Sequence, residues 1–121
     1  MAIDFDIGAT SAALLDAIRK QAKQGWNKIS GLVTPQTKMM AQQAAWIAES
    51  SLIGALKDDP ELQSMFSDQL ADSVRGLAKD VAALTILTVE KVWNVAVKIL
   101  WGAINKILSS ATGGLLALPV L

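Results

Sequence analysis

The hydrophobic pattern is dominated by residues 81–108, a stretch that is apolar around most of a helical circumference. Most of its polar residues fall within an arc of roughly 120° on a helical wheel. This polar seam includes Lys91, Asn94, Lys98 and Asn105. The rest of the surface is Val, Ile, Leu, Ala and Trp. A helix with so little polar surface has to be covered by other helices, by copies of itself or by lipid.

Two shorter helices are predicted before this stretch. Apolar residues at helical spacing favour a first helix over residues 10–31. Thr34 followed by Pro35 is typical of a helix start, because Thr caps the N-terminus and Pro is tolerated at the first helical position. We therefore predict a turn at 31–34 and a second helix over residues 35–56.

A third helix is predicted over residues 60–108. Asp59, Pro60 and Glu61 supply an acidic cap, a first-turn proline and a charge that complements the helix dipole. No proline interrupts the pattern from Glu61 to Leu108, so the stretch is predicted to form one helix of about 70 Å. Its first half has a short coiled-coil-like run of apolar residues at Leu70, Val74, Leu77, Val81 and Leu84.

Both ends of the chain are predicted to dock rather than to extend into water. Residues 1–9 alternate apolar and acidic positions, which predicts an extended arm on a neighbouring subunit or folded back over its own bundle. Residues 109–121 form an uncharged apolar tail after the helix stops. Its leucines, Leu115, Leu116 and Leu118, are candidate assembly or membrane contacts.

The predicted fold class is all-α. The elements combine into an elongated helical bundle or hairpin with two shorter helices and one long, very apolar third helix, plus the arm and the tail. The length is that of one ordinary domain, so residues 1–121 are predicted to form a single helical domain.

Charge and composition favour assembly over nucleic-acid binding. Eleven Lys and Arg balance eleven Asp and Glu, so no global field attracts nucleic acid, and none is expected as a partner. Zero net charge with 52% hydrophobic residues leaves little to oppose self-association, so a homo-oligomer or a subunit of a larger assembly is expected. Arg19, Lys20, Lys23 and Lys28 form a modest basic cluster, which we interpret as a solvated face.

No catalytic, cofactor or metal motif is present. Without Cys or His, the chain lacks thiol and histidine metal ligands and the common nucleophile–base pairs. Its closely spaced carboxylates are explained by helix capping and by a solvated helix face. We expect no enzyme activity, no cofactor and no small-molecule substrate.

The polar seam has two interpretations. If several copies surround an axis with Lys91, Asn94, Lys98 and Asn105 inward, they line a wet, mildly cationic channel; otherwise the seam is the solvated edge of a buried helix. A conventional single-pass span fails because charged residues interrupt every long apolar run. The tryptophans Trp46, Trp93 and Trp101 suit subunit contacts, a membrane interface or a core.

The function expected from these patterns is that of a non-enzymatic structural subunit of a larger oligomeric complex. Its amphipathic helix is a candidate for contact with a lipid bilayer, as in a small virion component such as a phage ejection or tail-associated protein. The alternatives are a soluble helical adaptor or scaffold and a pore-forming oligomer. The first residues carry no export signal, which favours synthesis in the cytoplasm before membrane association or packaging in a virion.

Overall fold

A computed structural model describes residues 5–54, 56 and 58–112, and this part of the chain is helical without a strand. The helices are α1 (Ile7–Ala22), the short 3₁₀ helix η1 (Lys23–Gly25), α2 (Trp26–Ile53), α3 (Pro60–Leu84) and α4 (Val89–Thr112). The all-α prediction is confirmed.

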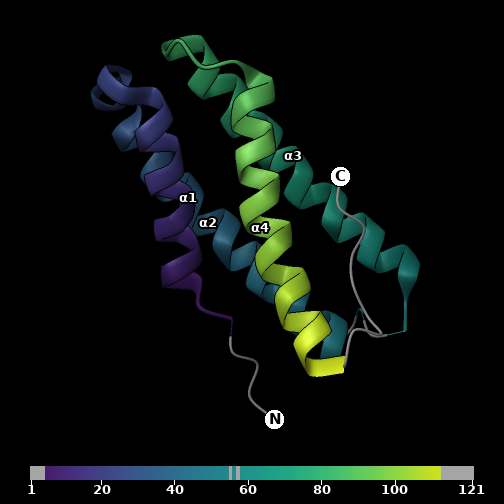
Figure 1. Cartoon of the computed structure of the whole chain (residues 1–121). Helices are drawn as coiled ribbons and strands as arrows, with labels where there is room; N and C mark the ends of the chain where they lie inside the picture. The colour runs from purple at the N-terminus through teal and green to yellow at the C-terminus, as the bar shows by residue number, and fades with distance from the viewer. Residues whose placement is uncertain (1–4, 55, 57, 113–121) are drawn as a thin grey trace.

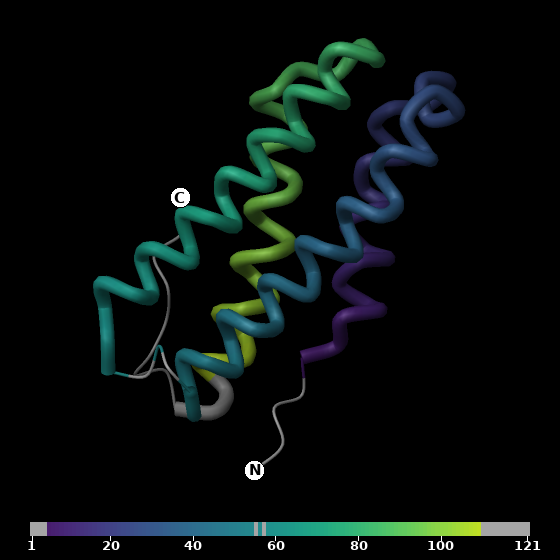
Figure 2. Tube along the Cα trace, turned by 180° about the vertical axis from the view of Figure 1, so that it is seen from behind, coloured from purple at the N-terminus to yellow at the C-terminus, as the bar shows by residue number. Residues whose placement is uncertain are grey.

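The α-helices form an up-and-down bundle (Figure 1). Helices α2 and α4 contact each other and also contact both outer helices, whereas α1 and α3 lie on opposite sides. In the view turned by 180°, α2 and α3 lie nearest to the viewer (Figure 2). The η1 corner and the α3–α4 turn lie at the same end of the bundle.

The core lies between the helices and is built from their regularly spaced apolar residues. Of the coiled-coil-like run in α3, Leu70, Val74, Leu77 and Val81 are buried as one face, whereas its last member, Leu84, is exposed. Trp101 of α4 is fully buried in the same core. The other helices thus cover the apolar face of α4, so its need for covering is met within a single chain.

The predicted turn at 31–34 is wrong. The chain turns instead at η1, and Pro35 lies inside the continuous helix α2. At this turn, Gly25 packs closely against Thr85 in the α3–α4 turn. A Cβ at position 25 would come within 3.1 Å of the Thr85 methyl group, so the absence of a side chain permits the close approach. The helix is therefore interrupted where the two corners pack closely, and the local start signal at Pro35 does not interrupt it.

The predicted single helix over residues 60–108 is also wrong beyond its first half. Its start is confirmed, because Asp59 accepts a hydrogen bond from the Leu62 amide at 3.1 Å and Pro60 occupies the first turn. The helix ends at Leu84, and Thr85 takes an extended conformation. A new helix begins at Val89, where the Thr88 hydroxyl accepts a hydrogen bond from the Lys91 amide at 3.2 Å.

The extended arm predicted over residues 1–9 is wrong for residues 7–9, which are helical. Helix α1 begins at Ile7, because Asp6 caps it by accepting a hydrogen bond from the Ala9 amide at 2.8 Å. Phe5 packs against the chain's own core. The tail predicted over residues 109–121 is wrong at its start, because α4 continues through Thr112. Residues 1–4 and 113–121 lie outside the described part of the chain.

Helix α4 is apolar on its inner side and carries polar groups on its outer side. Its hydrophobic residues pack against the core, while Glu90, Lys91, Asn94 and Lys98 are exposed. Among the described helices, none combines the length and the hydropathy that a membrane crossing needs.

Candidate interaction surfaces

The polar seam lies on the outer side of α4 in the single chain. Lys91, Asn94 and Lys98 are exposed, and Asn105 is half-buried. Lys91 and Asn94 also line a shallow hollow together with residues near the end of α1. In the single chain, Lys91, Asn94 and Lys98 therefore face outward, and a channel would require further copies around them.

The three tryptophans singled out from the sequence occupy different environments. Of the environments that the sequence allowed, Trp101 lies in the core. Its indole N–H donates a hydrogen bond to the Ser67 hydroxyl at 3.2 Å. Trp93 is half-buried, with the Arg75 guanidinium 5.0 Å from its ring centroid. Trp46 remains 43% exposed and is the one of the three that offers a large surface to a partner. The leucines Leu115, Leu116 and Leu118 lie outside the described residues.

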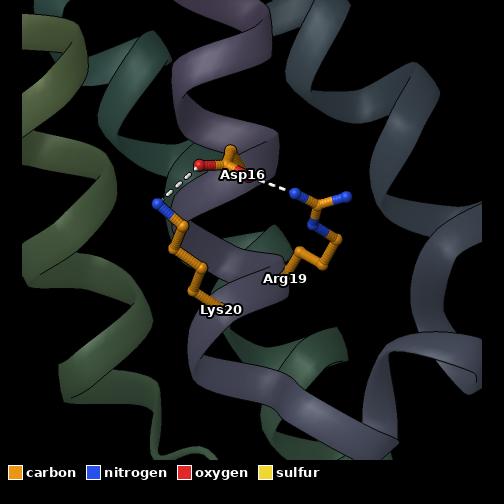
Figure 3. A network of polar contacts seen from close by, with 3 residues as sticks. All are labelled: Asp16, Arg19 and Lys20. Atoms are coloured by element: carbon orange, nitrogen blue, oxygen red, sulfur yellow. Dashed lines mark hydrogen bonds and ion pairs between the residues drawn. The ribbon is translucent and has the colours of Figure 1, made fainter.

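Charged groups in the described part of the chain do not gather into a metal site. No group of three or more acidic side chains able to hold a metal ion occurs there. Asp16 interacts with Lys20 and Arg19, and the hydrogen bonds from these two side chains lower the pKa of its carboxyl group (Figure 3). Because all three side chains are on the surface of α1, this network is a helix-surface ion pair.

The first exposed apolar surface lies on α2 and α3. Met39, Trp46 and Ile53 are exposed and follow one another at seven-residue spacing, so they form a line along α2. Phe66 of α3 pairs with Trp46 at 4.6 Å between ring centroids, and the exposed Met65 precedes it. We call these five residues the α2–α3 face.

A hollow of about 170 Å³ opens beside the aromatic pair of the α2–α3 face. Trp46, Phe66 and Gln43 are among its lining residues. The Gln43 side-chain oxygen is buried there with no hydrogen-bond partner in the described part of the chain. A buried acceptor of this kind normally has a hydrogen-bond donor. Another polypeptide bound at the hollow could supply that donor.

The second exposed apolar surface lies at the α3–α4 turn. Leu84, Ile86 and Val89 are exposed here, and we call them the apolar tip. Four lysines, Lys20, Lys23, Lys28 and Lys91, line the hollows on either side of Ile86 and form what we call the lysine rim.

Sequence reasoning missed both surfaces as units. Trp46 was identified, but its partner Phe66 was not, because the pairing depends on how α2 packs on α3. The apolar tip was missed because the α3–α4 turn was missed. Thr85 and Thr88, with Glu90 just after them, were the available signal for a helix end followed by a new cap.

The described chain is thus a helical bundle with two exposed apolar surfaces, one along α2 and α3 and one at the α3–α4 turn. No protein-family model, no curated protein and no solved structure matches this chain.

Proposed function

We propose that the protein is a non-enzymatic structural module that assembles with a second copy of itself through the α2–α3 face. The observation that carries this proposal is the exposed line Met39, Trp46 and Ile53. Large apolar side chains exposed on one side of a helix are typical of interaction sites, and here exposed Gln42 and Glu49 separate them. The need to cover α4, which first suggested assembly, no longer supports it, because α4 is covered within the chain.

The spacing of the line suits a two-fold axis. Trp46 lies midway between Met39 and Ile53, so an antiparallel copy of α2 would place Met39 against the partner's Ile53 and the two Trp46 side chains at the centre. A two-fold interface uses the same patch on both copies, and this patch is self-complementary in that arrangement.

The charges beside the line agree with the same arrangement. Exposed Lys38 adjoins Met39 at one end of the line, whereas Asp58 and Asp59 follow its other end in the α2–α3 connection. Antiparallel pairing would bring Lys38 of each copy toward the acidic connection of the other. A parallel pairing would instead set like charges together, which is unfavourable.

The apolar face can form the centre of an interface whose rim is polar. Helix α2 has 28 residues and is therefore about 42 Å long. The exposed line from Met39 to Ile53 covers about 21 Å of this length, and α2 and α3 together are about 20 Å wide, so the α2–α3 face measures about 400 Å². This is about half of the usual area per partner in a specific interface, and exposed polar residues along both helices would supply the rest. The proposal requires no chemistry beyond packing, in agreement with a sequence that contains neither Cys nor His.

Sedimentation velocity and native mass spectrometry over the micromolar range test this proposal. The wild type should dimerise, and Met39→Lys/Ile53→Lys should weaken the dimer about a hundredfold, since each lost apolar contact contributes about 1.5 kcal/mol. Both side chains are exposed, so the helix content should not change. Gln21→Lys/Asn94→Lys adds the same charge at exposed positions of α1 and α4 and should leave the dimer intact.

A charge reversal tests the antiparallel geometry. Lys38→Glu should weaken the dimer severalfold, because it places a negative charge near the partner's acidic connection, whereas Lys98→Glu on the outer side of α4 should not. A wild type that stays monomeric would overturn self-assembly. A dimer whose stability is unchanged by the Met39 and Ile53 substitutions would overturn assembly through the α2–α3 face. A monomer would favour the rival function, a soluble adaptor for a different protein.

The broader setting remains a hypothesis. A self-assembling helical module of this size suits the expected role as a subunit of a larger complex, for which a virion or phage tail component was the example. The proposed assembly surface lies on α2 and α3. The sequence analysis instead pointed to the apolar stretch 81–108, most of which lies in α4.

A further inference from the structure

The apolar tip is held in an exposed position by the α3–α4 turn. Ile86 is 85% exposed, whereas the next residue, Leu87, is buried in the core. Thr85 fixes this alternation: its hydroxyl donates to the Val81 carbonyl at 2.8 Å and accepts from the Leu87 amide at 3.1 Å. Leaving an isoleucine in water is unfavourable, so a turn built around that exposure suggests an apolar environment for it.

The surroundings of Ile86 are cationic. One hollow beside it is lined by Lys23 and Lys28 from the η1 corner, and the other by Lys20, Lys23 and Lys91. No carboxylate is among the described residues that line either hollow. The lysine rim therefore surrounds an aliphatic centre with positive charge.

Three lysines of the rim are available to an external anion. Lys20 shares Asp16 with Arg19, so its charge is partly compensated on α1 (Figure 3). Lys23, Lys28 and Lys91 take no part in the ion pairs found among the described residues. Glu90 beside Val89 and Asp80 near the end of α3 offset part of this charge. Because Asp58, Asp59 and Glu61 lie at the opposite end of the bundle, the overall charge of zero still hides a local excess of lysine.

Lys23 also has an unusual backbone. It ends α1 with φ 52° and ψ −119°, a conformation that favours glycine and costs another residue about 1–3 kcal/mol. The chain nevertheless places a lysine there, directly in both hollows beside Ile86. Strain of this kind is common where a side chain serves a binding role.

From these observations we infer that this end of the bundle docks on an anionic membrane surface. Ile86, with Leu84 and Val89 beside it, enters the boundary between headgroups and acyl chains. The lysine rim binds the phosphate and carboxylate groups of anionic lipids around it. Apolar insertion and lysine attraction to an anionic leaflet each contribute only modestly, so stable peripheral binding combines the two.

A membrane suits this surface better than nucleic acid does. Proteins that bind single strands interleave basic residues with aromatic rings on which bases stack. Neither hollow has an aromatic residue among its described lining residues, and the centre of the surface is an aliphatic side chain. An exposed isoleucine contributes nothing to phosphate contact, but it gains free energy on entering lipid.

Vesicle co-sedimentation tests the inference. The full chain should bind phosphatidylcholine vesicles in which about a third of the lipid is phosphatidylserine, and should not bind pure phosphatidylcholine vesicles. Lys23→Gln/Lys28→Gln should weaken binding about 25-fold, at about fivefold per lysine. Ile86→Ser should weaken it about tenfold through lost insertion, without changing the fold, because the side chain is exposed.

Matched variants distinguish docking through the apolar tip and the lysine rim from non-specific adsorption to vesicles. Lys23→Arg/Lys28→Arg and Ile86→Leu keep charge and hydrophobicity, so both should bind as the wild type does. Lys98→Gln/Lys106→Gln removes two exposed lysines of α4 outside the rim and should have little effect. Sedimentation of each variant without lipid keeps self-assembly distinguishable from lipid binding.

Several outcomes would overturn the inference. These are no binding to phosphatidylserine vesicles, equal binding by Ile86→Ser and the wild type, or equal loss in the Lys98/Lys106 variant. Binding of a DNA duplex or single strand that depends on Lys23 and Lys28, with no binding to vesicles, would assign the surface to nucleic acid instead.

Discussion

Pro35 is an exposed proline in the interior of α2. It cannot donate the usual backbone hydrogen bond to Gly31, and its ring crowds that turn of the helix. Pro35→Ala should therefore raise the free energy of unfolding by about 2–3 kcal/mol. Urea-induced unfolding followed by circular dichroism measures the change.

Pro60 provides the control for this prediction. It lies in the first turn of α3, where the missing N–H would be unpaired in any case, so Pro60→Ala should change stability by about 0.5 kcal/mol or less. If Pro35→Ala were equally neutral, Pro35 would be at a helix start, as the sequence pattern suggested, and the structure of α2 would be wrong there.

Asp16 gives a pH-dependent contribution of known sign. Hydrogen bonds from Lys20 and Arg19 lower its pKa in the folded state, so the ionised form favours folding. This contribution is fully present above the ordinary pKa of 3.8 and is lost as the pH falls through the lower folded-state pKa. The Tm difference between wild type and Asp16→Asn should therefore be constant near neutral pH and shrink only below pH 3.8. A difference that disappears near neutral pH would contradict this assignment.

At the scale of elements, the break between α3 and α4 has a direct test. Thr88 caps α4, so Thr88→Ala should lower the free energy of unfolding by about 1 kcal/mol. In one continuous helix the same change would stabilise slightly, because Ala has a higher helix propensity than Thr. The sign of the change in thermal or urea unfolding distinguishes the two structures.

Thr34 is the matched control for Thr88. It lies inside α2, where its hydroxyl donates to the Ser30 carbonyl at 2.7 Å, a bond that does not cap a helix. Thr34→Ala should be neutral or stabilising by a few tenths of a kcal/mol. Equal destabilisation by both changes would show that loss of a threonine, and not of a cap, is being measured.

At the scale of the whole molecule, the position of the polar seam distinguishes the remaining functions. Lys98 is exposed on the outer side of α4, so Lys98→Leu should change the free energy of unfolding by no more than about 0.5 kcal/mol. A clear stabilisation would mean that assembly buries the seam in a dry interface. Thermal unfolding of both proteins measures the difference.

The pore-forming alternative makes a different prediction for the same variant. If copies of the chain lined a channel with Lys98, the wild type would release dye from liposomes and Lys98→Leu would not, although its oligomer would persist. We expect no release that depends on Lys98, because the surfaces proposed for contact lie on α2 and α3 and at the α3–α4 turn.

The two proposed surfaces occupy different parts of the molecule and use different forces. The α2–α3 face offers a line of apolar side chains to another protein, whereas the apolar tip with its lysine rim offers one isoleucine and several charges. One chain could therefore use both surfaces at once. Salt should weaken membrane docking through the rim much more than assembly through the face.

The sequence by itself determined the features that depend on local geometry and periodicity. Helical spacing placed Leu70, Val74, Leu77 and Val81 on one buried face, and the cap Asp59 followed by Pro60 located the start of α3. Both signals act within a few residues along the chain, so they can be read without knowing what packs against them.

Only the tertiary structure decided where the helices are interrupted and which distant residues meet. Gly25 allows the η1 corner to touch Thr85. This contact joins the η1 turn, which the sequence misplaced at 31–34, to the α3–α4 turn, which the sequence did not predict. The same approach brings Ile86 among Lys23 and Lys28, which are remote from it in the chain. A start signal such as Thr34–Pro35 is worth little against the packing of whole helices, because burial of many apolar side chains outweighs one unfavourable proline.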